Sequence, residues 1–169
     1  MSIHFKIRST LLDMIRSDLA RPHPFAYERV GWVSAGVSRL GTGSLMLLAQ
    51  DYHPVADDHY AHDRSVGAMM NSAAIRAALE RSYKTRTVAL HVHVHEHVGT
   101  PAFSGTDNRE NAKFIPDFFN VAAHAPHGAL LLSHDQMRGD LWLSRTDGPH
   151  QITRFTAVGA PLWLEGDAR

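Results

Sequence analysis

Residues 88–97 read Val-Ala-Leu-His-Val-His-Val-His-Glu-His, and this alternation constrains the fold more than any other segment. Successive side chains of a β-strand point to opposite faces of the sheet, so the order predicts a strand, which we place at 87–95. One face then carries Val88, Leu90, Val92 and Val94. The other carries Ala89, His91, His93, His95 and His97. Two histidines in i, i+2 register present imidazoles on the same side, close enough to share one metal ion.

Any metal site in this chain must use histidine, aspartate or glutamate, because the 169 residues include 13 histidines and no cysteine. The absence of cysteine excludes disulfides, a thiol nucleophile, an iron–sulfur cluster and a cysteine-based zinc site. The 17 basic and 17 acidic residues give a formal net charge of zero, which argues against a protein that grips a nucleic-acid backbone. The length suits a single domain, 1–169.

The sequence contains no segment typical of a membrane span or a secretory signal. Charged residues interrupt the apolar ones throughout residues 1–20. The longest apolar runs, such as 45–49 and 129–132, are far shorter than the ~20 residues that a transmembrane helix requires. We therefore predict a cytoplasmic protein that binds neither membranes nor nucleic acid.

Several runs of apolar and β-branched residues predict strands in addition to the histidine strand. The first is expected at 3–8, and two more at 28–40 and 43–55, joined by turn residues 41–43. The polar segment 56–67 is interpreted as a loop with room for one short strand. Three β-like runs follow in the C-terminal part of the chain, at 129–133, 139–144 and 151–158.

Three helices are predicted between these strands. The first starts with Ser9 as its N-cap and ends before Pro22 and Pro24. The second is capped by Asn71 or Ser72. Its expected apolar side consists of Ala73, Ile75, Ala78, Leu79 and Tyr83. Strands that alternate with helices, followed by a run of strands, are typical of an α/β domain with a mixed β-sheet flanked by helices.

A third metal ligand is available in the segment that follows the histidine strand. Gly99 and Pro101 end that strand, and the chain then reads Ser104-Gly105-Thr106-Asp107. Serine followed three residues later by an acid resembles a capping box, which would start the third helix and place Asp107 in its first turn. A carboxylate there can face the histidines. Two imidazoles, one carboxylate and an open fourth position make a catalytic zinc site.

These residues resemble the HxH…SxxD signature of the JAB/MPN (JAMM) zinc metalloproteases, because eight residues separate His93-Val94-His95 from Ser104–Asp107. That family also has an upstream glutamate in an ExxG context, and Glu28-Arg29-Val30-Gly31 is similar to it. The order of elements agrees over most of the chain, and the segments around 54–60, 73–79 and 126–130 look like the bacterial stand-alone, deubiquitinase-like branch. The chain departs from the family at Glu96, where proline is frequent.

The resemblance implies a cytidine-deaminase-like (JAB/MPN) architecture and a role for each motif residue. His93, His95 and Asp107 would bind one zinc ion per chain, with water as the fourth ligand. Glu28 would act as general base and general acid. The hydroxyl group of Ser104 would help to hold the oxyanion.

Other acidic and histidine residues compete for the role of metal ligand. The spacing of the bacterial branch, counted back from Ser104, selects His93 and His95. We therefore expect His91 to be packed behind the ligands and His97 to lie in a loop near the cleft. A further His/Asp-rich patch matches no ligand spacing and is interpreted as a solvated loop or part of a substrate rim. Its members are Asp51, His53, Asp57, Asp58, His59, His62 and Asp63.

The resemblance implies a zinc-dependent hydrolase that cleaves an isopeptide or peptide bond after the C-terminal tail of a ubiquitin-like protein. Its partners would be that protein or its conjugates, together with E1-like and E2-like proteins. Two alternatives stay open at this point: a catalytically inactive MPN-type interaction scaffold, and a zinc hydrolase of a small amide conjugate. Signatures of other hydrolases are absent from the sequence, namely a GxSxG elbow, an HExxH helix and the PCxxC cysteines of zinc deaminases.

Overall fold

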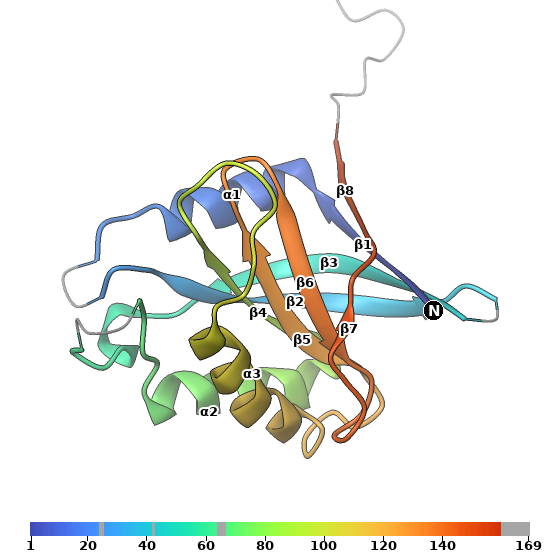
Figure 1. Cartoon of the computed structure of the whole chain (residues 1–169). Helices are drawn as coiled ribbons and strands as arrows, with labels where there is room; N and C mark the ends of the chain where they lie inside the picture. The colour runs from blue at the N-terminus through green and yellow to red at the C-terminus, as the bar shows by residue number, and fades with distance from the viewer. Residues whose placement is uncertain (24–25, 42, 64–66, 160–169) are drawn as a thin grey trace, which may run out of the picture.

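A mixed eight-stranded sheet forms the centre of the part of the chain that the computed structural model describes, residues 1–23, 26–41, 43–63 and 67–159 (Figure 1). Its strands are β1 (Ser2–Arg8), β2 (Val30–Arg39), β3 (Ser44–Pro54), β4 (Val88–Val94), β5 (His127–Leu132), β6 (Met137–Trp142), β7 (His150–Gln151) and β8 (Arg154–Val158). The helices are α1 (Ser9–Leu19), α2 (Ser72–Thr85) and α3 (Gly105–Phe118), with a short 3-10 helix at Asp57–His59. The predicted α/β class, a mixed sheet flanked by helices, is confirmed.

The sheet curls until its two edges meet. Its strand order is β7-β6-β5-β4-β2-β3-β1-β8, so the predicted strand 151–158 is divided into β7 and β8 at opposite ends of the order. Between them, Ile152 donates its N–H to the carbonyl of Gly139 at 2.8 Å, and Thr153 donates to the carbonyl of Ile3 at 2.9 Å. Two consecutive residues thus connect β6 with β1. β4 lies near the middle, antiparallel to β2 and parallel to β5.

Helices cover both faces of this sheet, α1 on one face and α2 with α3 on the other (Figure 1). The buried side chains of α1 pack against the face formed by the valines and the leucine of β4; they are Leu11, Ile15 and Leu19. On the opposite face, Trp32 of β2 packs with Phe118 of α3. His91 lies on this second face, against Trp32 and Phe114. The predicted alternation of β4 is therefore confirmed.

The start of α1 differs from the prediction. The N-cap residue is Arg8, and no side chain caps the helix. Ser9 is the first helical residue, and its hydroxyl group donates to the carbonyl of Gly159 at 3.0 Å. The prediction of Ser9 as N-cap was wrong because β1 continues into α1 without a loop. The helix ends at Leu19, ahead of Pro22; Pro24 lies outside the described residues, as does Thr42 of the predicted turn.

The buried side of α2 is rotated relative to the prediction. Ala74, Ala78 and Ser82 are buried at i, i+4 spacing, whereas Ala73 and Tyr83 are exposed. Small side chains at the contact let the helix approach the sheet closely, and the larger Ile75 and Leu79 pack beside them. Asn71 is the cap: its side-chain oxygen accepts hydrogen bonds from the N–H groups of residues 73 and 74.

The segment 56–67 contains the 3-10 helix and a single bridge between Tyr60 and Met70, in place of a strand; residues 64–66 lie outside the described part. No helix within the described ranges has the length and apolar character of a membrane span.

His127 at the start of β5 connects three parts of the fold. Its Nδ1 accepts a hydrogen bond from the N–H of Ala89 at 3.1 Å, and its Nε2 lies 3.1 Å from the carbonyl of Ala122. Because a carbonyl only accepts, the proton is on Nε2 and the ring is neutral. Burial lowers the pKa of His127 to about 4, although the contact with Ala122 opposes the shift. A proton on Nδ1 would break the bond to β4.

We predict that His127 makes stability depend on pH. Its pKa is lower in the folded state than in the unfolded chain, so the stabilisation is complete above about pH 6.5 and is lost as the pH falls toward 4. The full effect is about 3 kcal/mol, taking ~1.4 kcal/mol per pKa unit. The His127→Gln variant retains a donor and an acceptor but does not titrate. The free energies of unfolding of the wild type and the variant, measured with urea, should therefore converge as the pH falls toward 4. A difference between them that stays constant with pH would contradict the assignment.

Candidate metal centre

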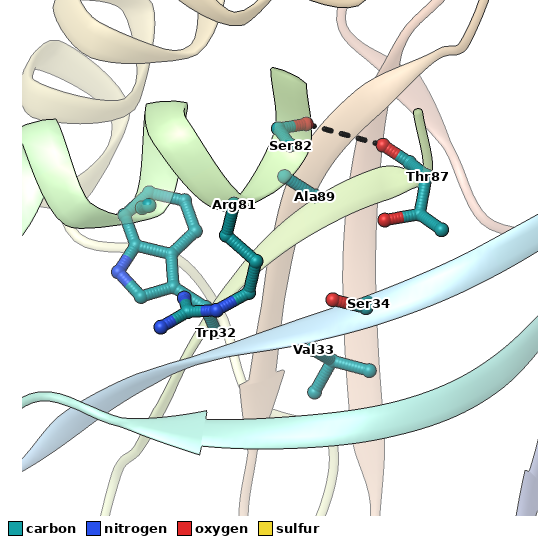
Figure 2. A pocket seen from close by; sticks show the side chains of 8 residues that line it. Trp32, Val33, Ser34, Arg81, Ser82, Thr87 and Ala89 are labelled. Atoms are coloured by element: carbon teal, nitrogen blue, oxygen red, sulfur yellow. Dashed lines mark hydrogen bonds between the residues drawn. The ribbon is translucent and has the colours of Figure 1, made fainter. Parts of the chain in front are cut away.

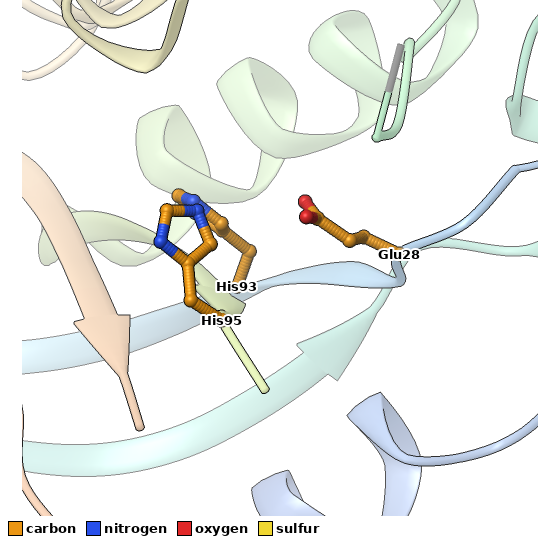
Figure 3. A group of neighbouring side chains, drawn as sticks. All are labelled: Glu28, His93 and His95. Atoms are coloured by element: carbon orange, nitrogen blue, oxygen red, sulfur yellow. The ribbon is translucent and has the colours of Figure 1, made fainter. Parts of the chain in front are cut away.

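The end of β4 presents two histidines toward the first turn of α3. His93 lies on the α3 side of the sheet and is 2% exposed, while the side chain of His95 is 23% exposed. His95 follows the last residue of the strand, but its N–H still donates to the carbonyl of Leu132 at 2.9 Å, which keeps it in register with β5. The two rings converge, with centroids 5.1 Å apart (Figure 3). They therefore face one common point.

The loop after β4 returns the chain to this point. Gly99 donates its N–H to Oδ1 of Asp135 at 2.7 Å, and His134 donates to the carbonyl of His97 at 2.9 Å. These bonds tie the loop to the turn between β5 and β6. Side-chain and main-chain contacts thus hold the loop. This chain has Glu96 at the position where the JAB/MPN family, which it resembles, frequently has proline.

Asp107 lies in the first turn of α3, where a capping box holds it. The hydroxyl oxygen of Ser104 accepts a hydrogen bond from the N–H of Asp107 at 3.1 Å, and Oδ2 of Asp107 accepts one from the N–H of Ser104 at 2.7 Å. The carboxylate then faces the histidines: Oδ1 lies 3.4 Å from Nε2 of His93, and Oδ2 lies 3.6 Å from Nε2 of His95. The predicted capping box is confirmed, and it coexists with a carboxylate that faces the imidazoles.

The spacing of these atoms fits ligands that share an ion. Nε2 of His93 is buried and has no hydrogen-bond partner among the described residues. Its 3.4 Å separation from Asp107 exceeds the usual 2.7–3.2 Å range of an N–H···O bond. Two ligands that are each about 2.0–2.1 Å from a tetrahedral zinc ion lie roughly 3.3–3.4 Å apart. The donor set of two imidazoles and a carboxylate also suits zinc.

Glu28 completes the group from the segment just before β2. In the antiparallel β2–β4 pair, Val30 lies opposite His93, so the residue two positions before Val30 comes close to His95. A carboxylate oxygen of Glu28 and nitrogens of His93 and His95 all lie within 4.8 Å of one another. Figure 3 shows the carboxylate directed toward the two rings. The five motif residues singled out in the sequence therefore lie together: Glu28, His93, His95, Ser104 and Asp107.

Electrostatics keep the carboxylate of Asp107 ionised. Partial burial by itself raises the pKa, but the contacts with His93 and Ser104 outweigh it, and the pKa of Asp107 lies well below its ordinary value. A metal ligand must be deprotonated, so this environment prepares Asp107 for binding at neutral pH.

The neighbouring histidines stand apart from the group. His91 is buried, with 7% of its surface exposed, and neither ring nitrogen has a hydrogen-bond partner among the described residues. Burial, followed by the nearby His93, lowers the pKa of His91 to about 3. Its ring packs against Trp32 and Phe114, with centroids 5.3 Å away in each case. His97 is exposed, and its Nδ1 lies 3.0 Å from the carbonyl of Val98. His91 is therefore a packing residue and His97 a loop residue, as expected.

Residues that sequence reasoning missed hold Glu28 in place. Arg29 is 3% exposed and donates to three separate groups: the carbonyls of Arg21 and Pro22, and Oδ1 of Asp57 at 2.7 Å. The hydroxyl group of Tyr60 bonds to both main-chain groups of Val30, accepting from N at 2.9 Å and donating to O at 3.2 Å. Nothing in the local sequence indicates these partners, since each lies in another segment.

The His/Asp-rich patch proves to be structural where its contacts are described. Asp57 is 53% exposed, as expected of a solvated segment, and it also pairs with Arg29; this hydrogen bond lowers the pKa of Asp57. Asp51 and His53 belong to β3, and Nε2 of His53 lies 3.1 Å from the hydroxyl oxygen of Ser34. Within the described ranges, the patch contributes no group of metal-ligand type; the group that exists is Glu28, His93 and His95.

A shallow pocket lies on the same face, further along β2. Its lining includes Ser34, Arg81 and Thr87, and Figure 2 shows the hydroxyl group of Ser82 donating to the carbonyl of Thr87 at 3.2 Å. Ser34 is four residues from Val30, which corresponds to about 13 Å along a strand. The pocket has no carboxylate and no histidine in its lining and is separate from the candidate metal centre.

Comparison with known proteins adds little. No family model and no curated protein match the chain. Among solved structures, the STIL N-terminal domain of Trichoplax adhaerens is similar with a TM-score of 0.37 and 6% sequence identity. The match covers 80% of this chain and 40% of that one, so this chain spans less than half the length of that structure. A likeness at this level carries no argument about fold or function.

We predict that His91→Phe retains metal binding and stability. An apolar ring replaces two buried nitrogens that have no hydrogen-bond partner, so the change in unfolding free energy should stay within ~1.5 kcal/mol. The matched variant His93→Phe removes a donor of the group and should abolish binding. Zinc content after dialysis, measured by elemental analysis, distinguishes the two; loss of zinc in His91→Phe would make His91 a ligand.

Proposed function

We propose that this protein is a zinc-dependent peptidase of the JAB/MPN (JAMM) type. One observation carries the proposal: the carboxylate of Asp107 lies 3.4 Å from Nε2 of His93 and 3.6 Å from Nε2 of His95, close to the spacing of tetrahedral ligands. A carboxylate oxygen of Glu28 lies within 4.8 Å of nitrogens of the same two histidines. These groups come from the HxH…SxxD and ExxG segments that resemble the family. The central position of β4 and the helices on both faces are consistent with a cytidine-deaminase-like architecture, which is part of the proposal.

A zinc ion held by these residues would act as a Lewis acid that activates water and polarises the scissile carbonyl group. Glu28 lies close enough to the ligand atoms to take the proton of the attacking water. The same carboxylic acid then delivers that proton to the leaving amine. Because Glu28 is outside the capping box and lies in the segment before β2, it can exchange protons while Asp107 remains fixed.

Ser104 suits the role of oxyanion donor. Its hydroxyl oxygen accepts the N–H of Asp107, which leaves the hydroxyl proton free to be donated, and the side chain is on the exposed side of the helix start. A neutral donor aimed at the developing negative charge stabilises the tetrahedral state. Ser104 would thus cap α3 through its hydroxyl oxygen and donate its hydroxyl proton to the oxyanion.

The substrate proposed is the C-terminal tail of a ubiquitin-like protein, joined by a peptide or isopeptide bond. E1-like and E2-like proteins are the proposed functional partners. Large apolar side chains are exposed in segments that adjoin the motif residues: Tyr27 is 76% exposed, Val98 75% and Met69 43%. Exposed apolar side chains around a site mark a surface for a protein segment more than for a small polar amide. An extended tail would present its main chain to such a rim.

We predict about one zinc per chain in the purified protein and its loss in Asp107→Ala. The variant removes the carboxylate that faces both histidines, so zinc affinity should fall at least ~100-fold while α3 loses only its cap, about 1 kcal/mol. Isothermal titration with zinc and circular dichroism measure the two effects. Asp117→Ala, at the other end of α3, is the matched control and should bind zinc as the wild type does. Full zinc occupancy in Asp107→Ala would remove Asp107 from the ligand set.

We also predict that Glu28→Gln binds zinc but loses catalysis. The amide retains the shape of the side chain without its basicity, so the rate should fall by about 10²–10⁴. The assay is release of a fluorogenic amide from the C-terminus of a ubiquitin-like protein, with a short acetylated peptide amide as the small-amide comparison. Glu96→Gln changes an exposed glutamate and serves as control. Unaltered turnover by Glu28→Gln would exclude the general-base role; no turnover by a zinc-loaded wild type on either substrate would indicate an interaction scaffold.

A further inference from the structure

Gly67 contacts Glu28 in two ways. Its carbonyl group bonds to the main chain of Glu28, and the carboxyl group of Glu28 fills the space where a side chain at position 67 would lie. The carbonyl oxygen of Gly67 accepts hydrogen bonds from the N–H groups of Tyr27 and Glu28, both at 2.9 Å. A Cβ atom on Gly67 would lie 2.6 Å from Oε2 of Glu28, 2.7 Å from Cδ and 3.0 Å from Oε1. The carboxyl group therefore occupies the space that any other residue at position 67 would need.

The backbone conformation at position 67 does not require a glycine. Among the glycines that the structure describes, those with positive φ are 41, 43, 99, 148 and 159, and Gly67 is not one of them. An alanine can thus adopt the backbone conformation found at this position. The constraint comes from the close approach of Glu28, whose carboxylate is bounded by Gly67 on one side and by His93 and His95 within 4.8 Å on another.

We propose that Gly67 is a positioning residue, which sets where the carboxylate of Glu28 lies relative to the two histidines. This inference rests on the proposed function, in which Glu28 moves the proton. With alanine at position 67, the carboxylate would have to move by roughly 0.8 Å, from 2.6 Å to the 3.4 Å of ordinary contact. Since the carboxylate ends a flexible side chain, the fold tolerates this shift. Catalysis does not, because a displacement of about 1 Å can cost ~100-fold in rate.

The test is Gly67→Ala in the full chain, combined with changes at Glu28. Gly67→Ala alone should retain one zinc per chain and lower kcat by ~100-fold on the fluorogenic amide of a ubiquitin-like protein, with little change in KM. In the Glu28→Gln background, which has the same shape but no base, Gly67→Ala should leave the residual rate unchanged. A merely structural role would instead lower the rate in both backgrounds.

Stability provides a readout that does not depend on turnover. Glu28→Ala removes the carboxylate that a Cβ would meet, so Gly67→Ala should lower the thermal midpoint of the metal-free protein by about 2–4 °C when Glu28 is present and by less when residue 28 is alanine. Gly36→Ala is the matched control, because its Cβ would lie 3.1 Å from Nε2 of the flexible Gln50, outside the metal centre. It should leave kcat unchanged.

The outcomes separate the two proposals. If the effect of Gly67→Ala on the thermal midpoint depends on Glu28 but the zinc-loaded wild type cleaves neither substrate, the proposed function is contradicted while the contact between Gly67 and Glu28 stands. Cleavage by the wild type with an undiminished kcat in Gly67→Ala would overturn the positioning role. Equal loss of zinc and of activity in Gly67→Ala would also overturn it, since the inference requires that the ligands stay in place.

Discussion

The antiparallel pairing of β2 with β4 is the interaction on which the metal centre depends. Val30 lies opposite His93, and this register sets Glu28 beside the end of the histidine strand. A slip by one residue would turn every side chain of β4 to the other face. The imidazoles would then enter the apolar cluster under α1, and Val92 would face Asp107. The apolar packing of Leu90 and Val92 against α1 thus protects the register that the chemistry needs.

At the start of α3, the atoms that cap the helix also face the two histidines. Asp107 accepts the N–H of Ser104 with Oδ2, and its Oδ1 faces His93 at 3.4 Å. Because the cap restrains the carboxylate, little side-chain freedom would be lost on binding the proposed ion. The helix N-terminus also favours negative charge at this place. A site built on a strand end and a capped helix start is held by regular structure on both sides.

Glu28 has a different kind of support. Its neighbour Arg29 is buried and pinned by two carbonyls and by Asp57, so the chain before β2 is fixed although it belongs to no strand. The carbonyl of Gly67 holds the N–H of Glu28, and the absence of a side chain there leaves room for the carboxylate. The protein thus anchors the main chain and confines the side chain to which we assign proton transfer.

Much of the fold and of the candidate site follows from local patterns. The alternation of 88–97, the capping box of Ser104 and the cap at Asn71 depend on residues close in sequence, and the structure agrees with each. The motif spacing also named the five residues that the structure brings together. Details that depend on distant segments were not predictable. The buried side of α2 was set by the sheet it meets, and Ser9 found its partner at Gly159.

The sequence by itself determined which residues carry reactive groups and which face of β4 presents them, because both depend on residue type and on the two-residue period of a strand. Only the tertiary structure decided how these groups meet. The division of 151–158 between two sheet edges, the ion pair of Arg29 with Asp57 and the contact of Gly67 with Glu28 join segments that are far apart in the chain. Such contacts have no local period, so they appear only when the sheet has curled and its loops have packed.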